Sequence, residues 1–375
     1  MPIKILFACG GTAGHINPAL AVAGLVRERW PGASILFAGN PSGMEATLVP
    51  KAGYDFAPIE VLGFQRKLNL RNIRNNLAAA GYLLTATGKA KKIIREFAPD
   101  ICMGTGGYVS GPVVRTAAKM KIPTLTHESN AFPGVTTRLL CKYVDKVLLG
   151  VPQAERYLQA EGKIATTGNP VREEILAAKR EESRRKLGIG TDKICLLSFG
   201  GSLGAQRLNE AIADVVAWHE DRRDIYHIHG TGQYGVELFT QLLWERGVNP
   251  ESSANLDWRE YIDDMPACLA AADLVICRAG ALSISELQAA GRASVLIPSP
   301  NVAGNHQYHN ARPLAEKNAA ILIEEKDLTG EGLVNIIADL AADPGELRNI
   351  GRNAAKMAIT DAGRRILNEI EQLLT

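Results

Sequence analysis

Short apolar runs of strand length alternate with stretches of helical periodicity along almost the whole chain. This alternation is typical of βαβ units, in which parallel strands are joined by helices that cover the sheet. We therefore predict an α/β protein. In the first half, the predicted strands lie near residues 3–9, 34–38, 58–62, 100–103, 123–127 and 145–149. In the second half, they lie near residues 194–199, 225–229, 273–277, 293–297 and 319–323.

One local pattern occurs in both halves. Gly10-Gly11-Thr12-Ala13-Gly14 follows the first predicted strand, and Gly200-Gly201-Ser202-Leu203-Gly204 follows the strand that begins near residue 194. Glycines at a strand-to-helix turn let backbone N–H groups approach an anion at the positive end of the helix. The repetition predicts two nucleotide-fold halves that face each other across a cleft.

The boundary between the halves is predicted from turn residues. Thr167-Gly168-Asn169-Pro170 combines a turn with a proline and predicts a hinge. We expect an N-terminal domain over residues 1–168 and a C-terminal domain over 169–357, with a last helix, about 358–375, that packs back on the first domain. The charged stretch Lys179–Lys186 predicts a solvated helix.

Composition narrows the class of protein. The net charge of +2 gives no electrostatic reason to expect a nucleic acid partner. The six cysteines form no C-x-x-C pair, which favours buried, reduced thiols in a cytoplasm. The chain starts with a strand pattern rather than a charged and then apolar leader, and no apolar run is long enough for a bilayer. No cluster of side chains has metal-ligand spacing.

His15 directly follows the first glycine loop, at a predicted helix start. A helix N-terminus disfavours the imidazolium form, so the ring should stay neutral and able to accept a proton as a general base. A capping or packing role is the competing interpretation. A dehydrogenase is disfavoured, because adjacent Gly10 and Gly11 break the G-x-G-x-x-G spacing and the second strand ends at Gly39-Asn40 without the ribose-binding acid.

Two further segments place polar groups after strands of the first half. Gly104-Thr105-Gly106-Gly107-Tyr108 offers many backbone N–H donors for a polyanion such as a diphosphate, and His127-Glu128-Ser129-Asn130 ends the next strand. The carboxyl ends of parallel strands are where such sheets bind ligands. Tight turns without a ligand are the alternative.

The second half offers a nucleotide seat at Arg278–Glu286, where a strand is followed by small residues and then a helix. Loop N–H groups could meet phosphate, and Glu286 could accept both hydroxyls of a ribose. Helix capping by the Ser283–Glu286 pair is the alternative. Asn305-His306-Gln307 follows the next strand and could bind a sugar.

A basic and apolar stretch could meet anionic lipid. Its cations flank the apolar residues Tyr82, Leu83 and Leu84, and an apolar patch ringed by cations suits a peripheral membrane protein. An amphipathic core helix is the competing interpretation. The cations are Arg66, Lys67, Arg71, Arg74, Lys89, Lys91, Lys92 and Arg95.

Taken in order, these segments resemble the MurG family of bacterial N-acetylglucosaminyltransferases over essentially the whole chain. The resemblance implies a GT-B fold, with two Rossmann-like domains and an interdomain cleft. It implies inverting transfer of GlcNAc from UDP-GlcNAc to the C4 hydroxyl of MurNAc in undecaprenyl-diphospho-MurNAc-pentapeptide (lipid I), which gives lipid II for the cell wall. It also implies no cofactor, an anionic membrane surface as partner, and a peripheral position on the cytoplasmic face of the bacterial inner membrane.

The resemblance assigns site residues. Glu286 would hold the ribose, Ser202 and the backbone of 281–285 the diphosphate, and Ile262 the uracil. Our hypothesis for the general base is His15, with Glu128 as runner-up or as the partner that orients it. The full donor set is Thr12, Ala13, Gly14, Asn130, Arg172, Ser202, Ile262, Ala281, Leu282, Ser283, Ile284, Ser285, Glu286 and Gln307. The acceptor set is Gly10, Gly11, Gly104, Gly106, Gly107 and Tyr108.

Two departures and three alternatives accompany this interpretation. Ala13 stands where the family loop commonly has glycine, and we expect it to be tolerated in an ordinary backbone conformation. The stretch near Tyr82 has no tryptophan. The alternatives are another GT-B enzyme such as a UDP-GlcNAc 2-epimerase, an NAD-type dehydrogenase, and a non-catalytic protein that binds lipid diphosphates.

Overall fold

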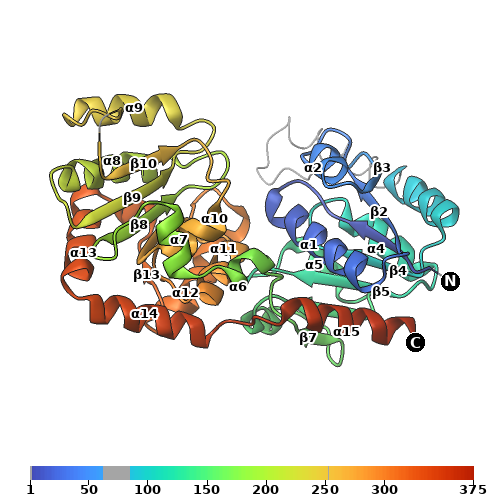
Figure 1. Ribbon diagram of the computed structural model, residues 1–375. Coiled ribbons are helices and arrows are strands. Elements are labelled where there is room, and N and C mark those ends of the chain that lie inside the picture. Colours follow the sequence, from blue (N-terminus) through green and yellow to red (C-terminus); the bar gives the residue numbers. More distant parts are fainter. Residues whose placement is uncertain (1, 62–84, 252) are drawn as a thin grey trace. The chain divides into compact units, whose positions relative to one another are not determined.

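The computed structural model describes residues 2–61, 85–251 and 253–375 (Figure 1). The chain forms two compact units, and each is described by itself. One unit comprises Met1–Pro170 together with Asp361–Thr375, and the other comprises Val171–Thr360. Residues 66–84 of the basic and apolar stretch lie outside the described residues. They include its apolar residues Tyr82, Leu83 and Leu84 and four of its cations.

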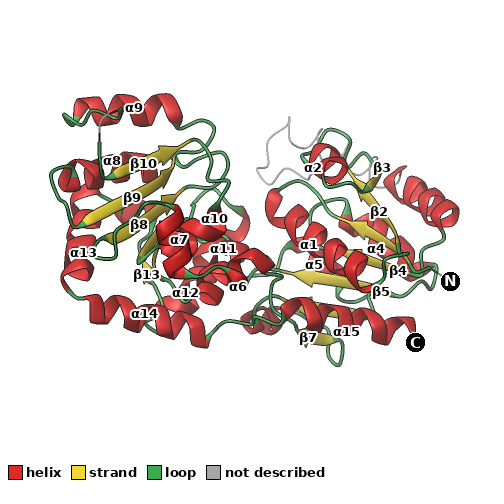
Figure 2. Cartoon of the chain, in the orientation of Figure 1, coloured by secondary structure: helices red, strands yellow, loops and turns green. Residues whose placement is uncertain are grey.

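The N-terminal unit is a parallel sheet with helices on both faces (Figures 1 and 2). Its strand order is β3-β2-β1-β4-β5-β6-β7. Two apolar cores, one on each face, are built from the buried sides of these strands. The strands are β1 (Lys4–Ala8), β2 (Ser34–Gly39), β3 (Asp55–Pro58), β4 (Ile101–Gly104), β5 (Thr124–Glu128), β6 (Lys146–Leu149) and β7 (Ile164–Thr166). The helices are α1 (Ala13–Arg29), α2 (Glu45–Lys51), α4 (Ser110–Lys119), α5 (Val135–Leu140), the 3-10 turn η1 (Pro152–Tyr157) and α15 (Ala362–Leu374), and residues 85–97 are also helical.

The last helix, α15, belongs to this first unit although it comes at the end of the chain (Figure 1). Its Ile366 and Ile370 are fully buried in the core that also contains α1. Glu369 Oε2 of α15 lies 2.9 Å from Nζ of Lys146, the first residue of β6. Burying two isoleucines contributes a few kcal/mol, whereas partly exposed ion pairs contribute little. Apolar packing therefore holds α15 in place.

The C-terminal unit repeats the plan with the strand order β10-β9-β8-β11-β12-β13, all parallel (Figure 2). Again each face of the sheet carries its own apolar core. The strands are β8 (Ile194–Phe199), β9 (Ile225–Gly230), β10 (Leu256–Arg259), β11 (Leu274–Cys277), β12 (Ala293–Leu296) and β13 (Ile321–Leu322). The helices are α6 (Glu173–Ala177), α7 (Arg180–Lys186), α8 (Gln206–His219), α9 (Val236–Glu245), α10 (Met265–Ala271), α11 (Ala281–Ala290), α12 (His306–Ala315), α13 (Gly330–Ala342) and α14 (Pro344–Lys356), with 3-10 turns η2 (Ala303–Asn305) and η3 (Glu325–Asp327).

Both sheets change strand order beside their first strand, between β1 and β4 and between β8 and β11. Connections leave such a pair toward opposite faces, so an opening remains at the carboxyl ends of the strands. The glycine-rich loops of the sequence lie at these ends. The predicted α/β class with Rossmann-like parallel sheets is thus confirmed.

Three details of the secondary structure differ from the prediction. β3 covers Asp55–Pro58 rather than 58–62, because its partner β2 ends at Gly39, opposite Pro58. β7 and β10 were not predicted: β7 has three residues, and β10 is an edge strand in which Asp257 and Arg259 interrupt the apolar pattern.

The charged segment at Lys179 is a helix, as predicted, but it is not solvated throughout. Arg184 is 4% exposed. Its guanidinium donates to Asp273 at 2.6 Å and to the carbonyl oxygens of Gly190 and Lys193. The bonds with these acceptors offset the cost of burying the charge.

All six cysteines are free and buried, as predicted. Burial raises the pKa of the Cys102 and Cys277 thiols to about 12. Such thiols are protonated near neutral pH and are poor nucleophiles. Across the described part of the chain, every helix is too short or too polar to cross a membrane.

A chain of buried polar side chains crosses the core of the C-terminal unit. His219 Nε2 lies 3.0 Å from His227 Nδ1, and Ser198 Oγ lies 2.7 Å from both His227 Nε2 and His229 Nδ1. Burial lowers the pKa of His219 to about 4 and that of His229 to about 3. These rings are therefore neutral in the folded protein.

We predict that this unit loses stability between pH 7 and pH 5. An unfolded histidine gains its proton near pH 6.5, whereas the folded ones resist it, so the stabilisation is complete above pH 6.5 and falls as the pH drops toward 4. One such histidine accounts for about 2 kcal/mol over this range. Urea unfolding at both pH values measures the loss, and His219→Leu should flatten the dependence. A free energy of unfolding that is equal at pH 7 and pH 5 would contradict this assignment.

Candidate active site

The first glycine loop places His15 in a defined orientation. The His15 ring is half-buried, and its Nδ1 lies 3.2 Å from the carbonyl oxygen of Gly10 and 3.2 Å from Thr12 Oγ1. A carbonyl oxygen can only accept, so a hydrogen bond between Nδ1 and Gly10 requires the tautomer with the proton on Nδ1. The other ring nitrogen, Nε2, then holds a lone pair and can accept a proton.

The loop after β4 packs directly against the loop after β1. A Cβ atom at Gly106 would lie 2.5 Å from His15 Cδ2, and one at Gly107 would overlap the carbonyl oxygen of Gly10. Thr105 Oγ1 donates to the carbonyl oxygen of His15 at 2.7 Å. The structure thus brings Gly10, His15, Gly106 and Gly107 together, three of which the resemblance placed in one acceptor set. Tyr108, beside them, is 54% exposed.

The remaining residues of the first loop open helix α1. Ala13 is the first residue of the helix, so its methyl group meets the ordinary backbone conformation that we expected. Thr12 is the N-cap residue but makes no side-chain capping bond. The amides of Ala13 and Gly14 therefore lie at a helix N-terminus without a side-chain acceptor from the cap.

Two residues that the sequence analysis missed support these loops. The carboxylate of Glu45 is fully buried and accepts the N–H of Gly11 at 3.1 Å. Ser110 is also fully buried, and its Oγ accepts the N–H of Gly106 at 3.2 Å. Since Glu45 occupies the Gly11 amide, a ligand at this loop would meet other donors. The only signal in the sequence was an acid that begins a helix, and a great many surface helices begin with one.

Glu128, the alternative base, is committed to its own loop. It is 5% exposed. Its Oε1 accepts the N–H of Asn130 at 3.0 Å and the Asn130 Nδ2 at 3.0 Å. Its Oε2 accepts the N–H of Gly134 at 2.9 Å and the hydroxyl of Thr137 at 2.7 Å. Four donors fill the lone pairs of this carboxylate, so it shapes the segment that presents Asn130.

In the C-terminal unit, helix α11 begins without a side-chain cap. Its N-cap is Gly280, and no side chain accepts from its first amides. Capping by the Ser283–Glu286 pair is therefore absent. Ser285 Oγ instead donates to the carbonyl oxygen of Ala281 at 3.0 Å. The N–H groups of the first turn, where Ala281, Leu282 and Ser283 lie, are at the positive end of a ten-residue helix, an arrangement that suits an anion.

Glu286 follows on the same helix and pairs with Arg172, whose Nε lies 2.9 Å from Glu286 Oε1. The carboxylate is 19% exposed and the guanidinium 48%. Burial raises the pKa of Glu286, and Arg172 opposes that shift. Arg172 and Glu286, two residues of the predicted donor set, are thus in contact with each other.

Three further predicted donor residues of the C-terminal unit lie in segments that follow β8, β10 and β12. Ser202 is exposed in the loop after β8. Ile262 is 5% exposed and packs beside Gly230 at the end of β9. Gln307 Oε1 accepts the N–H of Ser299 at 2.8 Å, which fixes that side chain at the start of α12. All three follow carboxyl ends of parallel strands.

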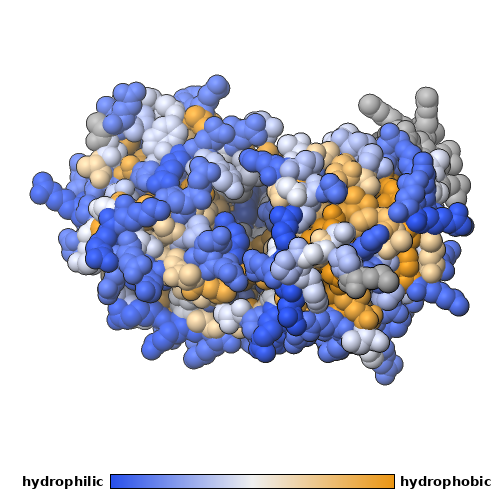
Figure 3. Space-filling view, turned by 45° about the vertical axis from the view of Figure 1, so that its right-hand side comes forward, coloured by the Kyte–Doolittle hydropathy of each residue, from blue (hydrophilic) through white to orange (hydrophobic). Residues whose placement is uncertain are grey.

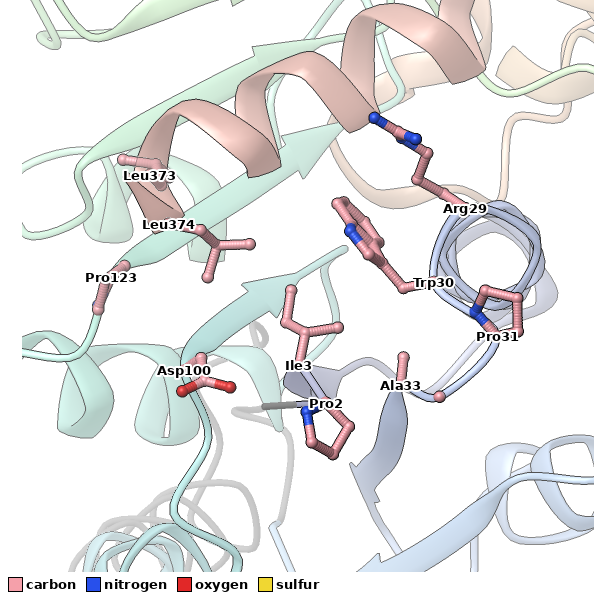
Figure 4. A pocket seen from close by; sticks show the side chains of 11 residues that line it. Pro2, Ile3, Arg29, Trp30, Pro31, Ala33, Asp100, Pro123, Leu373 and Leu374 are labelled. Atoms are coloured by element: carbon pink, nitrogen blue, oxygen red, sulfur yellow. The ribbon is translucent and has the colours of Figure 1, made fainter.

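A separate pocket of about 650 Å³ lies in the N-terminal unit, lined by Trp30, Leu373 and Leu374 among others (Figure 4). Its other lining residues include Ile3, Ala33, Asp100 and Pro123, which come just before β1, β2, β4 and β5. The pocket is therefore at the amino ends of the strands, opposite the glycine loops.

Comparisons with known proteins cover both units. The glycosyltransferase family 28 N-terminal domain matches residues 5–149, and the glycosyltransferase family 28 C-terminal domain matches residues 195–366. A protein of Acetivibrio thermocellus is 43% identical over 372 residues, which are 99% of this chain and 98% of that protein. One of Desulforamulus reducens is 41% identical over 372 residues, 99% of each chain. Both are named UDP-N-acetylglucosamine--N-acetylmuramyl-(pentapeptide) pyrophosphoryl-undecaprenol N-acetylglucosamine transferase.

The crystal structure of Acinetobacter baumannii MurG matches 99% of this chain and 100% of its own, with a TM-score of 0.77 and 28% identity. The chain belongs to the MurG family. This confirms the resemblance drawn from the glycine loops and the GT-B fold that it implied. A structure named as a UDP-N-acetylglucosamine 2-epimerase from Listeria monocytogenes matches this chain with a TM-score of 0.66 at 17% identity, which shows a shared fold.

We predict that Glu128→Gln destabilises the N-terminal unit. The amide nitrogen of glutamine cannot accept, so at least one of the four donors around Glu128 is left buried without a partner. This should cost about 1–3 kcal/mol in the free energy of unfolding. Chemical denaturation measures the cost, with exposed Glu155→Gln as the matched control. Equal stability of the two variants would argue against a structural role for Glu128.

Proposed function

We infer that this protein transfers GlcNAc from UDP-GlcNAc to the C4 hydroxyl of MurNAc in lipid I and forms lipid II for peptidoglycan synthesis. The observation that carries this conclusion is the identity of 41–43% with transferases of that name over the full length of the chain. The α-linked donor gives a β-linked product, so the reaction inverts the anomeric carbon and needs a base on the acceptor hydroxyl.

The donor is held by the C-terminal unit. The free amides at the start of α11 meet the diphosphate of UDP, and Ser202 adds a hydroxyl donor. As the bond to UDP breaks, charge builds up on the leaving diphosphate, and fixed backbone dipoles stabilise it without reorganising. Glu286 accepts the ribose hydroxyls while Arg172 and Gln307 bind further donor groups, and Ile262 packs on the uracil.

The acceptor is held by the N-terminal unit. Free amides of the loops around Gly10–Gly14 and Gly104–Gly107 meet its diphosphate, beside the exposed Tyr108. Thr12, Ala13, Gly14 and Asn130 bind the GlcNAc group. His15 Nε2 accepts the proton of the attacking hydroxyl, which its hydrogen bond to the Gly10 carbonyl supports. Glu128 is the weaker candidate because four donors already occupy it.

The protein binds this lipid-linked acceptor at an anionic membrane surface, on the cytoplasmic side of the membrane. Figure 3 shows hydrophobic residues gathered on part of the surface of the N-terminal unit. Val135 and Leu139, four residues apart on α5, are 52% and 63% exposed. Tyr143 follows at 43%, with the Arg115 guanidinium 4.8 Å from its ring centre. Exposed apolar residues beside cations suit peripheral binding to anionic lipid.

Transfer of radiolabelled GlcNAc from UDP-GlcNAc to lipid I tests the activity directly. Labelled lipid II is the expected product, and its formation should require both substrates. An absence of transfer with correctly folded protein would overturn the proposal. Conversion of UDP-GlcNAc without any acceptor would instead identify an epimerase.

We predict that His15→Ala mainly lowers kcat, by about 10²–10⁴-fold, the usual contribution of a general base. The KM for UDP-GlcNAc should change little, since most of the residues proposed to bind the donor belong to the other unit and His15 itself is not among the donor-binding residues. Steady-state kinetics separate the two effects, and thermal stabilisation by UDP shows that the variant is folded. Near-normal turnover would remove His15 from the role of base.

We predict that Glu286→Ala mainly raises the KM for UDP-GlcNAc. Loss of hydrogen bonds from a charged carboxylate costs about 1.5–3 kcal/mol, or roughly 10–100-fold. Glu237→Ala, an exposed residue of α9, is the matched control. An unchanged KM in Glu286→Ala would refute the ribose assignment.

A further inference from the structure

Glu45 is a fully buried carboxylate directly behind the first glycine loop. Its Oε2 accepts the N–H of Gly11 at 3.1 Å, and its Oε1 accepts the N–H of Asn40 at 2.9 Å. Each of the two carboxylate oxygens therefore accepts one backbone N–H. The site is built around this side chain, since a Cβ atom at Gly10 or Gly43 would overlap its carboxylate oxygens.

The Gly11 N–H and the Gly10 carbonyl belong to one peptide unit. Glu45 binds the N–H side of this unit, and His15 Nδ1 lies 3.2 Å from the oxygen on the carbonyl side. The three groups form a continuous chain in which the imidazole donates to the carbonyl and the same peptide's N–H donates to the carboxylate. The chain spans the β1–α1 loop and the start of α2, 30 residues after His15 in the sequence.

Hydrogen bonds in such a chain polarise one another. A carboxylate that accepts from a peptide N–H makes the carbonyl of that peptide a stronger acceptor, by about 10–30% per bond in condensed phase. The imidazole is then held more firmly with its proton on Nδ1. In the Ser-His-Asp triad a carboxylate contacts the imidazole directly and fixes its tautomer and orientation. Here one peptide unit stands between the two groups.

We propose that Glu45 is a positioning residue for the transfer reaction, which fixes the tautomer and orientation of His15 through the Gly10–Gly11 peptide. This inference rests on the proposed role of His15 as the base. It explains why an anion-binding loop has a buried carboxylate behind it. The Glu45 carboxylate binds the Gly11 amide, which is then not available to a ligand. Through this peptide it keeps the proton of His15 on Nδ1, so that Nε2 can accept a proton.

A double-mutant cycle separates this role from simple support of the loop. Glu45→Gln keeps the shape of the side chain but cannot accept at both ends. Its kcat should fall by about tenfold, a coupling typical of residues in one hydrogen-bond network. In the His15→Ala background the same change should lower the residual rate less than about twofold, because no imidazole is left to position. Exposed Glu60→Gln is the matched control and should leave both rates unchanged.

Nitrogen-15 NMR of the imidazoles measures the tautomer of His15. A role of Glu45 that is limited to supporting the loop would leave this tautomer unchanged. In the unmodified protein the neutral His15 ring should carry its proton on Nδ1. In Glu45→Gln the signal should shift toward the Nε2-protonated form that free histidine prefers. The measurement on the unmodified protein does not depend on the folding of any variant.

Several outcomes overturn the inference. They are an Nε2-protonated His15 in the unmodified protein, an unchanged tautomer and kcat in Glu45→Gln, or an equal loss in both backgrounds. Near-normal turnover by His15→Ala is a different failure, since it removes the base assignment itself. The two failures are therefore distinguishable.

Discussion

Each sheet of this protein reverses its strand order beside its first strand, and the rest of the structure depends on that reversal. Two neighbouring parallel strands whose connections leave toward opposite faces cannot both be covered at their carboxyl ends. The backbone in the opening must turn sharply and keep its N–H groups accessible. Glycines supply the turn, and helix N-termini such as that of α11 supply the positive end of a dipole.

The two units use this opening differently. In the C-terminal unit, the amides at the start of α11 are left without a side-chain acceptor, which suits a ligand that carries its own negative charge. In the N-terminal unit, the Gly11 amide is already bound by a carboxylate of the protein. The two copies of the repeated sequence pattern also differ in their electrostatics. Among the described residues, the buried acid Glu45 lies behind the loop Gly10–Gly14, and no buried acid lies behind Gly200–Gly204. A doubled motif does not by itself imply a doubled function.

The sequence was sufficient to predict most of the strands and the glycine loops at their carboxyl ends, because each depends on residues close together in the chain. The role of His15 as the base stays a prediction. Glu45 was missed because its contacts with Gly11 and Asn40 arise only when α2 packs under the β1–α1 loop. Arg184 was assigned to a solvated face for the same reason, since its acceptor Asp273 comes 89 residues later. The edge strand β10 was missed because its polar residues break the apolar run that marks buried strands.

Because helix α15 belongs to the first unit, the two units do not become complete in the order in which they are synthesised. Ile366 and Ile370 fill the first unit's core, yet they come after the whole of the second unit in the sequence. The second unit has all of its own residues by Thr360 and can finish folding earlier. The first unit, although made first, exposes apolar surface of α1 until α15 arrives. A nascent chain stalled after Thr360 would therefore present a complete second unit attached to an incomplete first one.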